Sequence, residues 1–313
     1  NPFETFEVVF ICCPSPLPRG HGPCLTGASF PVQLIRDLTS LRDALFSLRS
    51  GGGRVALVPT MGALHEGHMS LVRAAQREAD HDVVSIFVNP TQFAPHEDFE
   101  AYPRQEARDA AILEAAGVAV LWAPPVAEMY PTGFATSISV GGVSGPLEGA
   151  HRPGHFDGVA TVVCKLFSQV GPDVALFGEK DYQQLAVIRR MVRDLDLPVE
   201  VVGVSTARAE DGLALSSRNA YLSDAERRQA AGLPAAMREG VTRLEAGDAA
   251  DVVLAGIRAR LEQAGFDPVD YVELADAVTL APVRSLGAPA RLLVAARLGK
   301  TRLIDNFPVG PLF

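Results

Sequence analysis

The sequence predicts an α/β protein in which a parallel-sheet domain is followed by a smaller α+β domain. Between residues 55 and 204, short apolar runs typical of buried strands alternate with longer runs of helical periodicity. Strands separated by helices favour a parallel sheet with crossover connections. After about Ala207 this alternation ends, and two long helical patterns precede the last strand-like runs. The chain length of 313 residues also favours two domains.

The elements of the first domain follow one another in a regular order. Expected helices follow His68, cross 104–116 and 157–170, and occupy 182–195. Two stretches rich in glycine and proline, 124–136 and 143–154, are expected to cover the ligand crevice. The expected strands are VALVP (55–59), VVSIFV (83–88), VAVLW (118–122), VALF (174–177) and VEVVGV (199–204).

The second domain is predicted from two helical patterns and two strand-like segments. The helices span 225–245 and 249–264, and the strands lie in DYVEL (270–274) and in the run 292–306. Within that run, Leu298-Gly299-Lys300-Thr301 resembles the end of a phosphate-binding P-loop. Val294 stands where the P-loop requires glycine, so a hairpin turn explains the motif better.

Polar motifs follow three strands of the first domain. They are Thr60–His68, Asn89–Phe93 and Gly178–Asp181. In open α/β sheets, ligands bind outside the carboxyl ends of the strands. The three motifs are therefore expected to meet in one crevice.

The segment around His65 and His68 predicts a phosphate site. An apolar strand leads into a glycine-containing turn and then into a helix, whose N-terminus attracts anions. Gly62 and Gly67 allow close approach to the backbone. An isolated His-x-x-His would more often cap a helix, and a zinc-protease site needs a four-residue spacing between its histidines. The strand and helix on either side favour the phosphate interpretation.

Four motifs in the same order resemble the pantoate–β-alanine ligase (pantothenate synthetase) family of the His-x-Gly-His nucleotidyltransferase superfamily. They are PTMGALHEGH, SIFVNPTQF, FGEKDYQQL and LSSRNAYLS. The resemblance runs from about Phe30 to Asn306. It implies a Rossmann-like nucleotide- and pantoate-binding domain over 30–206 and a C-terminal α+β domain over 207–313.

The resemblance implies ATP-dependent condensation of pantoate with β-alanine through a pantoyl adenylate, releasing AMP and pyrophosphate. Charge that develops on the phosphates calls for positioned cations, N–H donors and Mg²⁺. The implied ligands are therefore ATP, Mg²⁺, pantoate and β-alanine, with the metal ligands unassigned. A homodimer is implied by family analogy.

The same resemblance implies the site residues. His68 is the implied proton donor, and His65, Lys180, Ser216, Ser217 and Arg218 are further catalytic candidates. Gln92 and Gln184 are implied to bind pantoate, and Gln92 also β-alanine. Leu215 and Ala207 depart from the usual Met and Val. The implied nucleotide site consists of Met61, Gly62, Ala63, Leu64, His65, Glu66, Gly67, His68, Gly178, Glu179, Lys180, Asp181, Ala207, Leu215, Ser216, Ser217 and Arg218.

Taken singly, these residues have simpler interpretations. Lys180 and Arg218 would be solvated surface charges, the two serines a cap or turn, and Asp181 an N-cap. Asn89 and Arg152 are weaker candidates for phosphate or substrate contacts. The acidic group Glu97, Asp98 and Glu100 is expected to be a solvated helix start.

Two other functions compete with the ligase. Another His-x-Gly-His nucleotidyltransferase would use a phosphorylated acceptor, which would favour Arg or Lys over Gln92 and Gln184. An inactive binding protein on this fold would not need His68, Lys180 and Arg218. AMP formation that requires both pantoate and β-alanine would distinguish the ligase from both.

Composition excludes several classes of protein. Lys and Arg total 28 against 37 Asp and Glu, a net charge of −9 that disfavours a nucleic-acid binder. Apolar runs are too short to cross a bilayer, so no membrane association is expected. Cys12, Cys13, Cys24 and Cys164 do not form a disulfide framework, and a reducing cytoplasm fits better. Residues 1–29 are expected to be an extension with little fixed structure.

Overall fold

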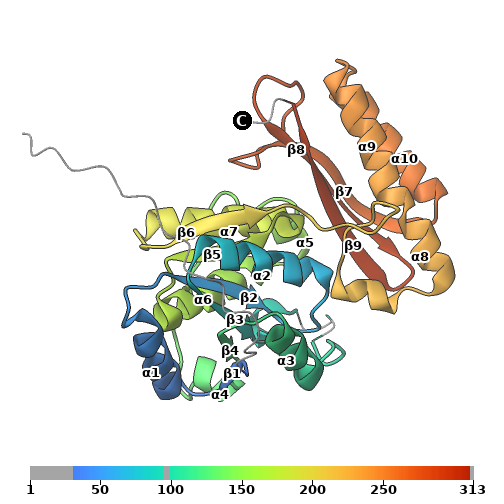
Figure 1. Cartoon of the computed structure of the whole chain (residues 1–313). Helices are drawn as coiled ribbons and strands as arrows, with labels where there is room; N and C mark the ends of the chain where they lie inside the picture. Colours follow the sequence, from blue (N-terminus) through green and yellow to red (C-terminus); the bar gives the residue numbers. More distant parts are fainter. Residues whose placement is uncertain (1–30, 95–96, 98, 311–313) are drawn as a thin grey trace, which may run out of the picture.

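The computed structural model describes residues 31–94, 97 and 99–310, and the predicted extension 1–29 lies outside them. The first domain is built on a six-stranded parallel sheet of order β1-β4-β3-β2-β5-β6, and the second on an antiparallel sheet of order β7-β8-β9 (Figure 1). This confirms the predicted fold class. The strands of the first sheet are β1 (Gln33–Ile35), β2 (Val55–Thr60), β3 (His81–Ile86), β4 (Val120–Trp122), β5 (Val174–Gly178) and β6 (Glu200–Val204).

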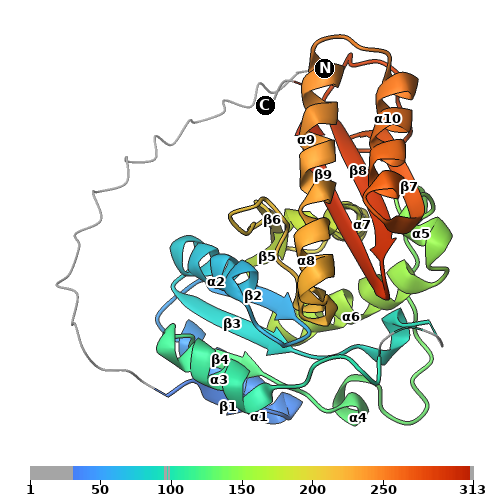
Figure 2. The same ribbon diagram turned by 90° about the vertical axis from the view of Figure 1, so that its right-hand side faces the viewer.

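Helices cover both faces of the six-stranded sheet (Figure 2). In β2, Val55 and Leu57 pack on the face of α1, α6 and α7, whereas Ala56 and Val58 pack on the face of α2 and α3. A strand buried on both faces has a continuous apolar sequence, and for this reason β2 and β5 can be predicted from the sequence. The helices are α1 (Leu38–Arg49), α2 (Glu66–Glu78), α3 (Glu106–Ala115), α6 (His155–Val170) and α7 (Tyr182–Asp194).

Several boundaries differ from the predicted ones. The helix expected after His68 begins at Glu66, because His65 serves as its N-cap. The pattern does not predict β1, which has three residues, or α1. The two stretches rich in glycine and proline, 124–136 and 143–154, contain the short helices α4 (Val126–Met129) and α5 (Glu148–His151).

The second domain packs two long helices on one face of its sheet. The single helix predicted over 225–245 is two helices, α8 (Asp224–Ala230) and α9 (Gly232–Glu245). With α10 (Ala250–Gln263), α9 covers one side of β7 (Phe266–Asp276), β8 (Ala290–Leu298) and β9 (Thr301–Val309). Gly299 and Lys300 join β8 to β9, which confirms the hairpin.

The other face of the small sheet contacts the first domain. Arg302 on β9 forms two 2.7 Å hydrogen bonds with the carboxylate of Glu148 in α5, and the Tyr271 hydroxyl donates to the same carboxylate at 2.7 Å. Burial and the Glu148 charge raise the pKa of Tyr271 well above its usual value. These contacts join the two domains beside the crevice. Among the described residues, no helix combines the length and apolar composition that a membrane crossing requires.

Candidate active site

A crevice lies at the carboxyl ends of β2, β3 and β5, where the three polar motifs meet. The structure brings most of the predicted site residues to its walls. Residues 205–207 and the 3₁₀ helix η3 (Ser217–Tyr221) close its far side. The predicted residues that line the crevice are Met61, His65, Gly67, His68, Gln92, Gly178, Lys180, Asp181, Gln184, Ala207, Leu215, Ser216, Ser217 and Arg218.

Five predicted nucleotide-site residues do not line this crevice. Leu64 is buried in the core, and Glu66 is turned outward to pair with Arg73. Glu179 pairs with Arg291 of the second domain. The other two, Gly62 and Ala63, lie in the turn between β2 and α2 and supply backbone rather than crevice wall.

His65 and His68 form a reciprocal cap at the start of α2. The His65 Nδ1 accepts a hydrogen bond from the Gly67 N–H at 3.1 Å, and the His68 Nδ1 accepts one from the His65 N–H at 3.3 Å. Their ring centroids are 4.1 Å apart. When both rings are neutral, each therefore carries its proton on Nε2. Two Nε2–H donors belong to the helix N-terminus.

Both histidines are neutral near pH 7. Burial, together with the adjacent His65, lowers the pKa of His68 to about 3. Burial, and next the positive charge of Lys180, lowers the pKa of His65. A neutral imidazole can donate a hydrogen bond from Nε2, but it is not an imidazolium acid.

Lys180 enters the crevice from the 3₁₀ helix η2 (Glu179–Asp181), between β5 and α7. Its Nζ is 3.6 Å from Asp181 Oδ1. Asp181 occupies the N-cap position of α7 but makes no capping hydrogen bond, so the cap interpretation of its side chain is wrong. The backbone around Lys180 is held from β9, where the Asn306 amide donates to the carbonyl groups of Glu179 at 2.8 Å and Lys180 at 2.9 Å.

The Ser216–Arg218 segment lies at the entry to η3. The Ser216 hydroxyl accepts a hydrogen bond from the Arg218 N–H at 3.3 Å, which makes it an N-cap as well as a crevice residue. The Ser217 hydroxyl lies 3.2 Å from the Tyr102 hydroxyl, and the Arg218 guanidinium lies 5.9 Å from the centre of the Tyr102 ring. Tyr102 is a crevice residue that the motifs do not predict.

The amide of Gln92 has a defined orientation. Asn89 follows β3, is 1% exposed, and donates from Nδ2 to Gln92 Oε1 at 3.0 Å and to the Gly158 carbonyl at 3.1 Å. The Asn89 Oδ1 accepts from the Tyr130 hydroxyl at 2.8 Å. With its oxygen turned to Asn89, Gln92 directs its NH₂ group to the other side, where it lies 3.2 Å from the Met61 sulfur. Asn89 thus orients a crevice residue.

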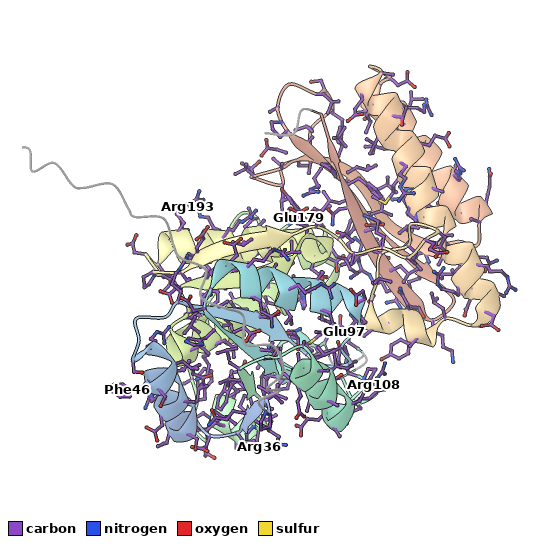
Figure 3. All side chains as sticks on the ribbon, in the orientation of Figure 1. Arg36, Phe46, Glu97, Arg108, Glu179 and Arg193 are labelled. Atoms are coloured by element: carbon purple, nitrogen blue, oxygen red, sulfur yellow. The ribbon has the colours of Figure 1, made fainter. Side chains whose placement is uncertain are left out.

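Arg152 contacts two other polar side chains at the crevice. Its guanidinium forms two 2.6 Å hydrogen bonds with Glu97, and its Nη1 is 3.1 Å from His155 Nε2. The expectation that Glu97 belongs to a solvated helix start is wrong, because the next helix begins only at Glu106. Glu97 and Glu179 both lie on the side of the first domain that faces the second, where Glu179 pairs with Arg291 (Figure 3). Asp98 lies outside the described residues.

The half-buried His155 should make the stability of the protein depend on pH. Burial, then the charge of Arg152, lowers its pKa to about 4 from 6.5. The unfolded chain therefore takes up the proton first, and stability present above about pH 6.5 is lost as the pH falls toward 4. When the pH is lowered from about 7.5 to 5, the free energy of unfolding of His155→Gln should fall by about 1 to 2 kcal/mol less than that of the parent chain. Urea unfolding at both pH values measures this difference.

A matched change tests whether the effect belongs to His155. His151→Gln alters an exposed histidine at the end of α5. It should keep the pH dependence of the parent chain. An equal pH dependence in the parent chain and in His155→Gln would show that His155 is not the group responsible.

The fold and the site define a nucleotide-binding α/β enzyme of the His-x-Gly-His type, with cations and neutral donors gathered at a helix N-terminus. Comparison with known proteins specifies the family. The model of the pantoate-beta-alanine ligase family matches residues 33–308. The chain is 61% identical to the pantothenate synthetase of Rhizorhabdus wittichii, over 90% of this chain and 99% of that protein. It therefore belongs to the pantoate-beta-alanine ligase family.

Solved structures agree with this assignment. The pantothenate synthetase of Thermus thermophilus matches with a TM-score of 0.85 at 49% identity, covering 90% of this chain and all of that one (100%). The Francisella tularensis enzyme, solved in complex with beta-gamma ATP and beta-alanine, matches with a TM-score of 0.76 at 34% identity, over 88% and 97% of the two chains. The activity of this chain is ATP-dependent condensation of pantoate with β-alanine.

Proposed function

We propose that the crevice joins the two substrates in two steps, with the phosphates of ATP at the N-terminus of α2. A pantoate carboxylate oxygen attacks the α-phosphorus, the bond to the β-phosphate breaks, and pyrophosphate leaves. The β-alanine nitrogen then attacks the acyl carbon, the bond to AMP breaks, and the amine proton passes to solvent. The observation that carries this proposal is the convergence of His68, Lys180 and Arg218 on one crevice.

Two kinds of group stabilise the charge that moves to pyrophosphate. His65 and His68 donate from neutral Nε2–H groups beside the helix N-terminus, which favours anions. Lys180 and Arg218 supply positive charge from two other elements. The depressed pKa of His68 supports a hydrogen-bond donor rather than an acid that gives up its proton.

The pantoate pocket is proposed between Gln92, Gln184 and α6. Pantoate carries two methyl groups beside its hydroxyl and carboxylate groups. Beyond His155 at its first position, the side of α6 that lines the crevice is apolar and fits these methyl groups, whereas the NH₂ of Gln92 suits a carboxylate or hydroxyl oxygen. The apolar residues of this wall are Val159, Val162, Val163 and Leu166.

Mg²⁺ is proposed to enter with the phosphates of ATP, where it supplies additional positive charge. Among the described residues, no group of three or more His, Cys, Asp or Glu side chains could hold a metal by itself. This fits Mg²⁺, which is commonly bound by one or two carboxylates together with substrate phosphates and water. Asp181 is an acidic residue on the crevice wall that is available to it.

We also propose that the domain boundary lies near residue 206, that the chain forms a homodimer and that it is located in the cytoplasm. The boundary is supported by the change from a parallel to an antiparallel sheet after β6. The dimer is supported by the position of β6 as the last strand of the described sheet, where its outer edge offers backbone groups for pairing. The cytoplasmic location is supported by the cysteine distribution.

Gln184→Ala should raise the KM for pantoate about ten- to a hundredfold, because a substrate oxygen would lose its partner in a confined pocket, at a cost of roughly 1 to 3 kcal/mol. The Kd of ATP measured without pantoate should barely change. As a control, Gln169→Ala removes an α6 side chain that accepts a hydrogen bond from Trp122 and does not line the crevice. It should leave the KM for pantoate and the Kd of ATP unchanged. Equal weakening of ATP and pantoate by Gln184→Ala would remove Gln184 from the pantoate pocket.

A further inference from the structure

Asp109 is a buried carboxylate that contacts the turn before α2. It lies in α3 and is 1% exposed, whereas its neighbour Arg108 is exposed on the same helix (Figure 3). The Asp109 Oδ2 accepts a hydrogen bond from the Ala63 N–H at 2.8 Å, and its Oδ1 accepts one from the Leu64 N–H at 2.9 Å. Both carboxylate oxygens are therefore bound to consecutive residues of one turn.

The turn has an unusual backbone at this point. Gly62 has a φ of 84° and Ala63 a φ of 51°, so two successive residues are left-handed. Glycine adopts this region readily, but alanine does so at a cost because of its Cβ. The conformation of Ala63 persists only if its surroundings hold it. Hydrogen bonds from the Ala63 and Leu64 N–H groups to a charged acceptor are suited to do so.

This turn determines where the two histidines lie. Ala63 is two residues before His65, whose side chain and backbone both take part in the reciprocal cap with His68. A change in the direction of the chain at Ala63 would move the His65 N–H that binds His68 Nδ1. The position of Asp109 is thereby linked to the orientation of both imidazoles.

We propose that Asp109 is a positioning residue for adenylate formation. It holds the left-handed pair Gly62-Ala63 and so directs the Nε2–H groups of His65 and His68 toward the phosphates. This inference rests on the proposed function of the two histidines. Asp109 does not line the crevice and is not assigned a contact with substrate.

Asp109→Asn is the direct test. The shape is kept, but one oxygen becomes an NH₂ group that faces a backbone N–H, so one hydrogen bond is lost. Pantoate-dependent exchange between ATP and pyrophosphate should fall about ten- to a hundredfold, from the loss of one charge-assisted hydrogen bond. The loss should appear in kcat for exchange more than in the KM for pantoate.

Asp82→Asn is the matched control for loss of a buried aspartate. Asp82 is 3% exposed, and it accepts hydrogen bonds from the Ala119 N–H at 2.9 Å and from Gln76 at 3.0 Å. It lies near the start of β3, at the opposite end of the strand from the crevice. Asp82→Asn should lower thermal stability and leave exchange kinetics unchanged. An equal loss of exchange in both variants would show that Asp109 acts only through general stability.

A second substitution tests the backbone argument itself. In the Ala63→Gly background, the loss caused by Asp109→Asn should be at least about fivefold smaller, because glycine adopts the left-handed conformation without the carboxylate. Ala63→Val, with Asp109 intact, should reduce exchange, because a β-branched residue strongly disfavours this φ. Ala63→Val therefore tests the inference even if Asp109→Asn does not fold. No coupling between positions 63 and 109, or normal exchange by Ala63→Val, would overturn the inference.

His68→Ala in the same assay separates this inference from the proposed function. Impaired His68→Ala with normal Asp109→Asn would reject only the positioning role. Normal exchange by His68→Ala would reject the role of the histidine pair, whatever the behaviour of Asp109.

Discussion

His68→Ala should lower the rate of pantoyl-adenylate formation by at least about a hundredfold, the scale found when one donor to a developing charge is removed. The His68 ring is half-buried at the first turn of α2 and is neutral, because desolvation and the adjacent His65 lower its pKa to about 3. Its Nε2–H is thus available at neutral pH without any change of protonation. Single-turnover formation of adenylate from ATP and pantoate measures the effect.

Two further variants distinguish a loss of catalysis from a loss of stability. His68 also accepts a hydrogen bond from the His65 backbone, so His68→Gln, which keeps polar atoms in place, should recover part of the rate. His81→Ala, at the start of β3 and outside the crevice, should retain full activity. Near-normal adenylate formation by a folded His68→Ala chain would remove His68 from the mechanism.

Lys180→Ala should lower the same rate by about a hundredfold or more, because it removes a positive charge from the site where phosphate charge develops. The cation comes from η2, whose backbone is held by Asn306. If Lys180 were only a surface lysine, its loss would cost about 0.5 kcal/mol or less in stability and nothing in rate. Stopped-flow measurement of pyrophosphate release separates these outcomes.

Lys165→Ala provides the matched lysine control. Lys165 lies in α6, with its Nζ 4.9 Å from the centre of the Phe134 ring, and it does not line the crevice. Its removal should leave pyrophosphate release unchanged. If Lys165→Ala and Lys180→Ala behave alike, the assignment of Lys180 to the phosphates fails.

The parts of the fold that can be predicted from sequence are those with local signals. Strands β2 and β5 are buried on both faces and therefore appear as continuous apolar runs. The three-residue β1 is too short to show a period, and the break between α8 and α9 falls at Ala231 inside a continuous helical pattern. Tertiary packing decides both features.

The same distinction applies to the site. His65, Lys180 and Ser216 can be placed in one crevice from the sequence, because they belong to contiguous motifs that follow strands or a domain change. Asp109 and Asn306 act through contacts with residues 46 and 126 positions away, so no window of sequence contains both partners. An isolated aspartate in a helix or asparagine in a strand has no local feature that separates it from a surface residue.

The interdomain hydrogen bonds of Asn306 have a consequence for inhibition. Lys180 belongs to the first domain, but its backbone is bound to a strand of the second. Rotation of the second domain away from the first would therefore release Lys180 from its proposed place beside the phosphates. A small molecule bound between β9 and η2 would therefore weaken ATP binding without occupying the nucleotide site, and by reciprocity bound ATP would weaken the binding of that molecule.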